Sequence, residues 1–456
     1  MSREARVAKH DAPEATRRFR VLLVPDSIYW VTGTIAKSIA AANPWIEATI
    51  VSAPLLKEFF PDASAIAKRF DLVHFICPYV SRDWIPQLRS VVPVVTSHHH
   101  VTSWDLISHN IEGDAIVAGS SEWVKDLEHR GADMSRVFRV PYGVDVDLFT
   151  PADARQRREM KKRLGLSGAS PVIGFFAKRG SNDDDRKGIN VFADAVVSLH
   201  RKVPQAGVLI VGPGWQDMVA GFRSRNIACA WLPFVEDGND IPPLYHALDF
   251  YWVTARVEGG PVPLLEAMSS GVCCLSTPVG LAREVINDGV NGIVMPMNDA
   301  EAFACMTTDL WQDEARRVWI SKSARATMQR EMRADEMARQ VRPVYERALQ
   351  VFSARNHGEA RTLPRPDMEP AQESDVPRSA LNAKERRRAE MLEALAWSEN
   401  LILYQHQRGA ALRLISKAWK DNPRSLEPPR VFLRRFLPGP VTRGVVSIRR
   451  RIRGRR

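Results

Sequence analysis

The chain has 456 residues, of which 45% are hydrophobic and 26% charged, and its formal net charge is +11. This length exceeds what a single hydrophobic core normally serves, so we expect at least two domains. The sequence holds no run of about 18 apolar residues and no apolar stretch near its start, so we expect neither a transmembrane helix nor an export signal. Five cysteines without CxxC spacing agree with a cytoplasmic location.

The positive charge is concentrated at the C-terminal end. Residues 430–456 contain ten arginines and no acidic residue, which leaves 54 basic and 53 acidic side chains in the rest of the chain. A nearly neutral body argues against nucleic acid as a partner. Apolar residues such as Phe432, Leu433 and Ile448 lie between the arginines, a pattern that suits peripheral binding to an anionic surface on the inner face of the cytoplasmic membrane. A solvated tail is the alternative, and the sequence leaves both open.

Short apolar runs alternate with amphipathic stretches along most of the chain. RVLLVPDS at residues 20–27 is followed by EATIVSA, DLVHFIC, PVVTSHH, AIVAGS and VFRVPYG. After a charged segment at residues 150–171, a second series runs through PVIGFFAK, AGVLIVG, IACAWLPF, ALDFYWVTA, GVCCLST and GIVMP. Such runs are typical of buried parallel strands connected by helices. The pattern predicts an α/β protein with two Rossmann-like, doubly wound sheets that face each other across a cleft.

The C-terminal part of the sequence has a different character. Asn382 and Glu385 predict a capping box at the start of a helix, and Asn422 with Pro423 ends a second helix. A Pro-rich, charged stretch before this pair is typical of a linker. We therefore expect a disordered N-terminus at 1–17, an acceptor-side domain at 18–155, a donor domain at 156–353, a linker at 354–380, a helical pair at 381–429 and an Arg-rich tail at 430–456.

The segment ARVEGGPVPLLEAMSSGVCCLSTPVG at residues 255–280 carries the clearest chemical signal. Glu258 follows a predicted strand, and Glu266 lies in LLEAMSSG, which is expected to open a helix. The positive end of a helix can face a phosphate, and carboxylates accept hydrogen bonds from sugar hydroxyls. Two carboxylates would then flank one ligand. The alternative is that Glu258 is an exposed loop acid and Glu266 only favours the helix start.

This segment resembles the E-x7-E signature of retaining glycosyltransferases of family 4, which have the GT-B fold. Over roughly residues 18–353, further segments resemble family motifs in the same order, namely VVTSHHH, IVAGSSEWV, RVPYGVDVDLFTP, FFAKRGSNDDDRKGINVFADAV, LIVGPG and PPLYHALDFYWVTARVEGG. The resemblance implies a metal-independent, retaining hexosyltransferase without a cofactor, which uses a nucleotide diphosphate sugar as donor. The acceptor is expected to be a sugar or a lipid-linked molecule. The Arg-rich tail at 430–456 prompts the lipid-linked hypothesis, as in cell-surface polysaccharide or glycolipid synthesis.

The resemblance also implies roles for particular residues. Glu258 would contact the transferred sugar near the reacting carbon, and Glu266 would hold the ribose hydroxyls. Lys187 would neutralise the diphosphate, which gains negative charge as the glycosidic bond breaks. Arg179 or Lys178 would share this task, and the alignment does not choose between them. The remaining implied residues are His98, near the transferred sugar, and the donor-site residues Gly33, Gly259, Gly260 and Val262.

Other interpretations of these residues remain open. His98 to His100, or the pair Asp183 and Asp185, could be a metal site, but neighbouring strand residues point to opposite faces and no carboxylate or cysteine lies at ligand spacing to the histidines. The glycines of VGPG at 211–214 lack the third glycine of a dinucleotide fingerprint. As functions, a non-catalytic sugar-nucleotide-binding protein, a membrane-associated scaffold and a sugar-nucleotide epimerase are the alternatives.

Overall fold

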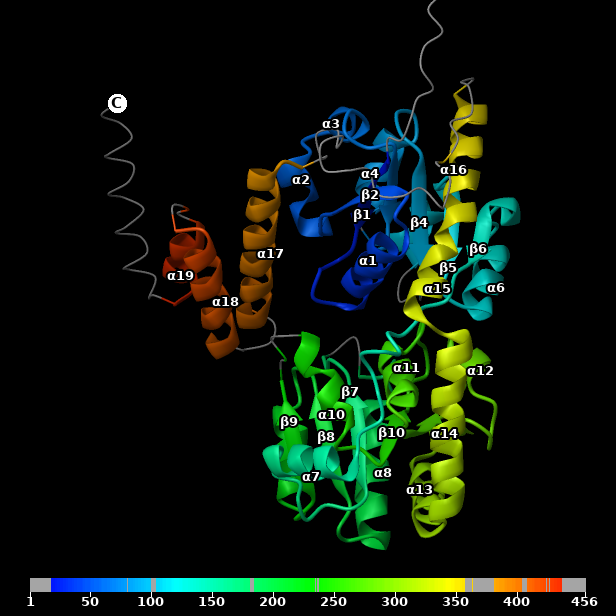
Figure 1. The fold of residues 1–456 in the computed structure, drawn as a ribbon, viewed down its shortest axis with the longest axis vertical. Coiled ribbons are helices and arrows are strands. Elements are labelled where there is room, and N and C mark those ends of the chain that lie inside the picture. Colours follow the sequence, from blue (N-terminus) through cyan, green and yellow to red (C-terminus); the bar gives the residue numbers. More distant parts are fainter. Residues whose placement is uncertain are drawn as a thin grey trace, which may run out of the picture.

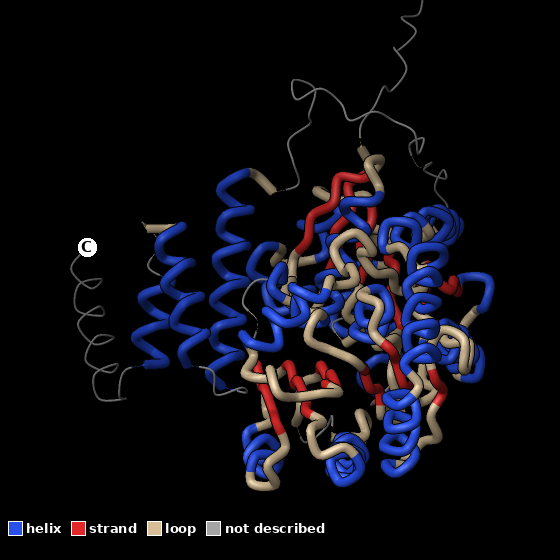
Figure 2. Tube along the Cα trace, turned by 60° about the horizontal axis from the view of Figure 1, so that its bottom comes forward, coloured by secondary structure: helices blue, strands red, loops and turns tan. Residues whose placement is uncertain are grey.

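The computed structural model describes residues 18–79, 81–99, 104–180, 184–233, 235, 238–356, 363, 381–403, 408–423, 425 and 427–436. The predicted disordered N-terminus, most of the predicted linker and residues 437–456 of the Arg-rich tail lie outside these described residues. Two six-stranded sheets, in which every strand pairing is parallel, lie one above the other (Figure 1). Figure 2 shows helices packed around both sheets, as the alternating pattern predicts.

The first sheet has the strand order β2-β1-β3-β4-β5-β6. Its four inner strands consist almost entirely of buried side chains because helices cover both faces, whereas the edge strands β2 and β6 are partly accessible. The strands are β1 (Phe19–Val24), β2 (Ile46–Ile50), β3 (Leu72–Phe75), β4 (Val94–His98), β5 (Ala115–Ala118) and β6 (Val137–Arg139). The helices between them are α1 (Val31–Ala42), α2 (Leu56–Phe59), α3 (Ala63–Ala67), α4 (Ser81–Leu88), α5 (Trp104–Ile107) and α6 (Ser121–His129).

The second sheet has the strand order β12-β11-β10-β7-β8-β9. The order reverses between β7 and β10, and in sheets of this kind ligands bind beyond the carboxyl ends of the strands at such a reversal. The strands are β7 (Val172–Phe176), β8 (Gly207–Val211), β9 (Ala228–Leu232), β10 (Phe250–Val253), β11 (Cys273–Ser276) and β12 (Ile293–Val294). The helices are α7 (Ala154–Arg163), α8 (Ile189–Lys202), α9 (Gln216–Arg223), α10 (Pro242–Tyr245), α11 (Val262–Ser269), α12 (Ala282–Val285), α13 (Ala300–Gln312) and α14 (Glu314–Glu331).

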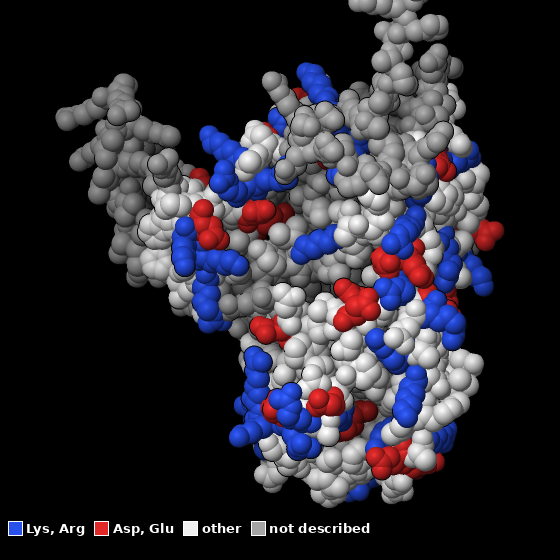
Figure 3. Space-filling view, in the orientation of Figure 1, with Lys and Arg blue, Asp and Glu red and all other residues white. Residues whose placement is uncertain are grey.

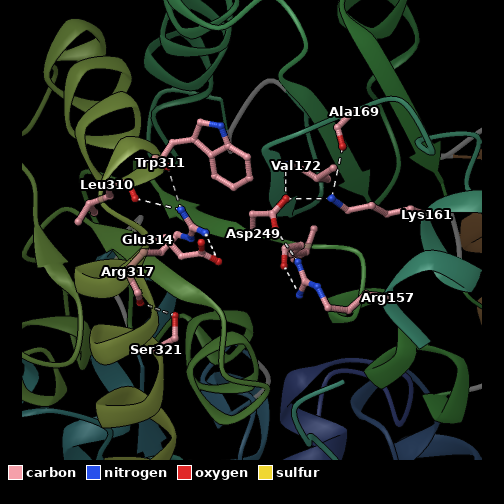
Figure 4. Close-up of polar contacts among 11 residues, drawn as sticks. Arg157, Lys161, Ala169, Val172, Asp249, Leu310, Trp311, Glu314, Arg317 and Ser321 are labelled. Atoms are coloured by element: carbon pink, nitrogen blue, oxygen red, sulfur yellow. Dashed lines mark hydrogen bonds and ion pairs between the residues drawn. The ribbon is translucent and has the colours of Figure 1, made fainter. Parts of the chain in front are cut away.

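Asp249 fastens α7 to the second sheet. Its carboxylate, on the residue before β10, pairs with Arg157 Nη2 at 2.5 Å and with Lys161 Nζ at 3.0 Å, and both cations lie on α7. The same carboxylate accepts a hydrogen bond of 2.8 Å from the amide of Val172, the first residue of β7 (Figure 4). The charged segment between the two series of strands therefore belongs to the second domain.

The chain returns to the first domain after α14. Helices α15 (Ala334–Arg339) and α16 (Val341–Arg355) lie in the range expected for the donor domain, yet their apolar faces enter the core of the first sheet. Tyr345 Oη lies 3.0 Å from Nδ1 of His74 on β3, and Arg355 pairs with Asp114 before β5. Helical periodicity reveals that a helix has a buried face but not which sheet covers it, so the sequence did not show this return.

Three helices form a C-terminal appendage beside the first domain (Figure 1): α17 (Ala383–Leu403), α18 (Arg408–Asp421) and α19 (Glu427–Phe436). The predicted capping box is confirmed, because Asn382 N donates to Glu385 Oε2 and Glu385 N donates to Asn382 Oδ1, each at 3.0 Å. The helices share a small core around Met391 and Ile415. Among the described helices, none is both long and apolar enough to span a bilayer.

Candidate active site

Glu258 lies at the reversal point of the second sheet, in the loop that joins β10 to α11. Its side chain is only 17% exposed, and its carboxylate pairs with two cations. Arg186 Nη1 lies 3.0 Å from Oε2, and Lys187 Nζ lies 3.9 Å from Oε1. Two cations thus face one carboxylate, which leaves the cluster with positive charge to offer to an anionic ligand.

Gly188 explains how the two cations reach Glu258. This residue precedes α8 with a φ of +62°, and a Cβ there would lie 2.0 Å from the carbonyl oxygen of Thr254, just after β10. Only glycine permits this approach. Thr254 Oγ1 also donates to the carbonyl oxygen of Lys187 at 3.0 Å. The loop before α8 is therefore held against the end of β10, which brings Arg186 and Lys187 to Glu258.

Glu266 occupies a separate, more enclosed position on α11. It accepts a hydrogen bond of 2.6 Å from the hydroxyl of Tyr245 on α10. Burial raises the pKa of Glu266 to about 7, although the Tyr245 hydrogen bond works in the opposite direction. A carboxyl with this pKa changes its protonation state near neutral pH and is a hydroxyl acceptor in its ionised form.

Gly259 and Gly260 bring the Glu258 loop against the first domain. A Cβ on Gly259 would lie 2.2 Å from the carbonyl oxygen of His99, and one on Gly260 would lie 2.4 Å from the ring of Tyr142. Neither position has room for a larger residue. Val262, the first residue of α11, is buried. The two glycines thus serve the contact between the domains, whereas their predicted contact with a donor phosphate stays a prediction.

His99 is the histidine that meets this loop. Its Nε2 lies 2.8 Å from the carbonyl oxygen of Ile76, which can only accept, so Nε2 carries the proton. Its Nδ1 then accepts from the hydroxyl of Tyr142. Burial and the charge of Glu258 raise the pKa of Tyr142, which keeps this hydroxyl protonated and able to donate.

His98 points elsewhere. Its buried ring places Nε2 3.0 Å from Oδ2 of Asp126, a carboxylate that Arg130 also contacts, and Nδ1 has no hydrogen-bond partner among the described residues. Burial lowers the pKa of His98, and the bond to Asp126 offsets part of this effect. The ring packs edge-on against Trp123, whose Nε1 donates to the carbonyl oxygen of Glu258 at 3.1 Å. His98 is therefore connected to Glu258 through the indole of Trp123. Its catalytic role stays a prediction.

The two candidates for a second diphosphate cation differ in their surroundings. Arg179 Nε lies 3.2 Å from Asp184 Oδ2, and its Nη1 pairs with Asp217. Lys178 is exposed. No contact recorded among the described residues joins either side chain to Glu258, so the structure does not bring them into this cluster. Arg186, adjacent to Lys187, is the second cation that contacts Glu258, and the diphosphate roles of Arg179 and Lys178 stay predictions.

Gly33 lies in the first turn of α1, where its missing side chain serves a local contact. A Cβ there would lie 2.5 Å from Ile28 Cα and from the carbonyl oxygen of Ser27. The glycine thus lets the loop after β1 fold back onto α1. Its predicted approach to donor or acceptor is not tested by this geometry.

The possible metal sites of the sequence gain no support from the described residues. Asp183 and His100 lie outside them, and Asp185 pairs with Arg256. Among the residues that are described, no group of three or more His, Cys, Asp or Glu side chains is arranged to hold a metal ion.

A cavity lies between the two domains beside His99 and Tyr142. It is bounded by α1, by the carboxyl ends of strands of the first sheet, by the start of α11 and by α15 and α16. Its mostly apolar wall also contains polar groups near His99. The lining residues are Val31, Thr34, Ile35, Ser38, Ile39, His74, Ser97, His99, Val117, Val140, Pro141, Tyr142, Gly143, Val262, Ala334, Met337, Ala338 and Val341.

Polar contacts also join α6 and β6 to the second domain. Glu122 Oε2 accepts from the amide of Gly280 at 2.9 Å. Glu284 on α12 accepts from the amide of Ser121 and pairs with Arg139 of β6. Figure 3 shows acidic side chains near the junction of the two domains. The two domains are thus held in contact next to the Glu258 loop.

Sequence reasoning assigned no role in a donor or acceptor site to Arg186, His99 or Tyr142. Arg186 and His99 each adjoin a residue that was singled out, and one-residue shifts of this kind are hard to resolve where the local motif departs from the family pattern. Tyr142 lies in RVPYGVD, a segment that was recognised without a role for its tyrosine. Its contact with His99 joins the segments that follow β6 and β4, two strands separated by β5 in the sheet, so no local pattern reveals it.

A known family model matches one part of the chain. Residues 170–313 match a family model described as Glycosyl transferases group 1. This range runs from the start of β7 to the end of α13 and includes Glu258, Glu266, Arg186 and Lys187.

Curated relatives match over about half of the chain. A D-inositol 3-phosphate glycosyltransferase of Xylanimonas cellulosilytica is 33% identical over 255 residues, which are 53% of this chain and 59% of that protein. The lipopolysaccharide core biosynthesis mannosyltransferase LpsB of Rhizobium meliloti is 28% identical over 214 residues, which are 45% of this chain and 59% of that protein. The chain thus spans less than two thirds of the length of these two relatives.

Solved structures support the fold. The crystal structure of HepE from Anabaena in complex with UDP and glucose superposes with a TM-score of 0.57 at 17% identity, covering 72% of this chain and 99% of that one. Together with the two parallel sheets, this likeness confirms the predicted GT-B architecture.

Proposed function

We propose that this chain, whose residues 170–313 form a glycosyl transferases group 1 domain, moves a hexose from a nucleotide diphosphate sugar to an acceptor hydroxyl with retention of anomeric configuration. The observation that carries the proposal is the cluster in which Arg186 and Lys187 face Glu258 at the reversal point of the second sheet. Because ligands of such sheets bind at this edge, the cluster lies where a donor is expected.

The two cations suit the diphosphate of the donor. As the bond between the anomeric carbon and the phosphate oxygen breaks, the nucleoside diphosphate gains negative charge, and fixed cations stabilise that charge more than they stabilise the bound donor. Arg186 and Lys187 pair with Glu258. A diphosphate would take over these cations and leave the carboxylate available to the sugar.

Glu258 then stabilises the positive charge that develops at the anomeric carbon. Its backbone carbonyl is fixed by Trp123, and its neighbours Gly259 and Gly260 are wedged against the first domain. The acceptor oxygen attacks from the face that the diphosphate leaves, and the leaving group accepts the acceptor proton. This ion-pair-like route accounts for retention without a covalent sugar-enzyme intermediate. Glu266 holds the ribose hydroxyls in its ionised form.

The reaction is proposed to need no metal. Arg186 and Lys187 supply positive charge next to Glu258, which is the task that a divalent cation performs in other phosphate sites. We propose no other cofactor, because the sugar is already activated by its diphosphate leaving group.

A lipid-linked acceptor at the inner face of the cytoplasmic membrane is the second part of the proposal. One relative is named for lipopolysaccharide core biosynthesis. On α18, Trp419 is 45% exposed and lies next to the exposed Lys417 and Lys420, and Figure 3 shows further basic side chains on the appendage. An exposed tryptophan among cations suits an anionic lipid surface, and the arginines of 430–456 extend the same charge along the sequence.

The donor proposal is tested by thermal shift of the purified chain with UDP, GDP, ADP and their common sugar conjugates, with and without EDTA. A base-specific rise in melting temperature that tolerates EDTA and weakens in Glu266→Ala supports the donor site. No shift with any nucleotide contradicts the donor proposal, and a shift that EDTA abolishes contradicts metal independence.

The membrane proposal has its own test. The full chain should sediment with phosphatidylglycerol vesicles but not with phosphatidylcholine vesicles, and added salt should release it. Deletion of 430–456 and Trp419→Ala should each reduce the bound fraction. Equal binding of both variants and the full chain would contradict this surface.

A further inference from the structure

The loop between β1 and α1 lies at a second reversal point. In the first sheet the strand order reverses between β1 and β3, and this loop follows the carboxyl end of β1. Asp26 and Tyr29 of the loop are exposed, with 37% of Tyr29 accessible. The next residues on α1, Val31 and Thr34, line the cavity that contains His99 and Tyr142. The loop therefore adjoins, through the start of α1, the wall of the cavity on the side of the first domain.

An aromatic cluster covers one side of this loop. Trp397 of α17 stacks on Tyr29, with ring centroids 5.8 Å apart and planes at 24°. The same indole meets Trp30 edge-on, with centroids 5.1 Å apart and planes at 89°. Trp397 is 5% exposed, whereas Tyr29 keeps an accessible surface. Trp397 therefore supports the two rings of the loop from behind.

Helix α17 is anchored to the first domain along its length. Near its start, Glu385 pairs with Arg69 at 3.4 Å, and Arg388 pairs with Glu58. Further along, the buried carboxylate of Glu393 accepts from the amide of Ser52, which follows β2, at 2.8 Å. A buried carboxylate bound to a backbone amide fixes the helix far better than exposed pairs do. The position of Trp397 is thus set by the first domain itself.

Asp26 adds a polar group to the same loop. Its Oδ1 accepts from the amide of Ser27 at 2.7 Å and from the hydroxyl of Thr32, so the carboxylate is held in one orientation. Desolvation by the surrounding protein raises the pKa of Asp26, and the hydrogen bond from Thr32 offsets part of this effect. The less polar face of a pyranose ring packs on aromatic rings, and its hydroxyls donate to carboxylates. The loop offers both kinds of group beside the cavity.

We propose that Tyr29, Trp30 and Asp26 form a subsite for a pyranose ring of the acceptor, and that the C-terminal appendage completes it through Trp397. Trp397 is a positioning residue, whereas Tyr29 is the ring that touches the sugar. This inference rests on the proposed function, because it takes the first domain as the acceptor side. It gives the appendage a role in acceptor recognition that the sequence did not reveal.

The test is saturation-transfer difference NMR on the full chain with the methyl glycosides of glucose, galactose, mannose and N-acetylglucosamine. We expect at least one glycoside to receive saturation at its ring C–H protons. Tyr29→Ala and Trp397→Ala should weaken its binding by about two- to tenfold, the range of an aromatic contact. Trp397→Phe, which keeps an aromatic support, should bind nearly as the unchanged chain does. Trp319→Ala, at an exposed tryptophan of α14, is the matched control and should have no effect.

Further readouts separate this inference from the proposed function. Nucleotide-induced thermal shift is measured on the same samples, and Tyr29→Ala and Trp397→Ala should leave it unchanged. The inference is overturned if no glycoside receives saturation, or if Tyr29→Ala leaves the transfer as it was. Absence of a nucleotide shift in the unchanged chain would instead remove the proposed donor function, whatever the glycosides do. If Trp397→Ala unfolds the appendage, glycoside binding by Tyr29→Ala and Trp397→Phe still tests the proposed subsite.

Discussion

Arg186 Nη1 lies 3.0 Å from Glu258 Oε2, and this pair joins the loop before α8 to the loop after β10. Both side chains are largely buried, so each depends on the other for its stability in the free protein. A ligand that replaces Glu258 as the partner of Arg186 must therefore be anionic, which is what a nucleotide diphosphate provides.

Removal of the cation without loss of side-chain bulk should reveal its role in catalysis. Arg186→Gln is expected to lower kcat for release of nucleoside diphosphate by about a hundredfold, the effect of losing one charge-stabilising donor. Lys187→Gln should have an effect of the same order, because its Nζ lies 3.9 Å from Glu258. Arg155→Gln, at an exposed pair on α7, is the matched control and should leave kcat unchanged. Equal kcat values for Arg186→Gln and this control would contradict the assignment.

The arrangement of strands was largely predictable from the sequence. Each of the twelve observed strands lies within an apolar run named from the sequence, apart from the first residue of β1, Phe19, and the first of β2, Ile46. The reason is that each strand of a parallel sheet covered on both faces needs an unbroken run of branched and aromatic side chains. Few other structural elements need such a run. Within each sheet, right-handed crossovers then limit which strands can lie side by side.

The parts that the sequence did not predict depend on long-range packing or on ambiguous prolines. The return of α16 to the first sheet places Tyr345 on His74, a contact that no local pattern reveals. The sequence predicts a helical pair at 381–429 and a tail from 430, yet a third helix, α19, runs over Glu427–Phe436 with Pro428 and Pro429 in its first turn. In the first turn, proline loses no helical hydrogen bond, so these residues are compatible with a helix start.

The structure brings some of the predicted site residues into contact and leaves others apart, and their roles stay predictions. Glu258 and Lys187 were predicted for one site, and the structure brings them together. Arg179 and His98 were chosen by position in a motif, but each has acidic partners outside the Glu258 cluster. Which of two adjacent side chains enters a site depends on strand ends and loop geometry, which the sequence pattern does not specify.

The ion pairs that hold α7 should dominate the stability of the second domain. Asp249 is 9% exposed and has three partners, Arg157, Lys161 and the amide of Val172. Asp249→Ala removes one acceptor from each of these donors, although Arg157 and Lys161 keep the carbonyl oxygens of Leu248 and Ala169. It is expected to destabilise the domain by about 1–3 kcal/mol. Glu159→Ala, which removes an exposed pair with Arg155, should cost less than about 1 kcal/mol. Calorimetry of the two variants should show a much lower transition temperature only for Asp249→Ala.

The close approach of Gly259 and Gly260 to the first domain should make both positions intolerant of a methyl group. Gly259→Ala places a Cβ 2.2 Å from the carbonyl oxygen of His99, and Gly260→Ala places one 2.4 Å from the Tyr142 ring. The domains must then separate locally, which displaces Glu258, and we expect kcat to fall by about a hundredfold. Gly168→Ala, where a Cβ meets nothing within 4 Å, is the control. Donor turnover of Gly259→Ala at the level of this control would show that the contact is dispensable.

The raised pKa of Glu266 predicts a proton linkage of donor binding. Burial raises this pKa to about 7 from 4.5, so the free folded protein holds the proton more tightly than the unfolded chain does. The contribution of Glu266 to stability is therefore fully present below pH 4.5 and is lost as the pH rises through about 7. A donor whose ribose hydroxyls need the carboxylate binds the ionised form, so its affinity should fall as the pH drops below about 7. Below this pH, binding should also release a proton.

Isothermal titration calorimetry at pH 6, in buffers that differ in ionisation enthalpy, measures this release directly. The apparent binding enthalpy of the nucleotide selected by thermal shift should vary with the buffer for the unchanged chain, with a slope near one proton released, because most Glu266 side chains are protonated at that pH. Glu266→Gln retains the size of the side chain but has no proton to lose, so its binding should be weaker and independent of the buffer. A buffer dependence that persists in Glu266→Gln would locate the proton on another group.

Tyr245→Phe should raise the pH at which the affinity for the nucleotide begins to fall. This substitution removes the hydrogen bond that favours the carboxylate form of Glu266, so the pKa of Glu266 should rise further.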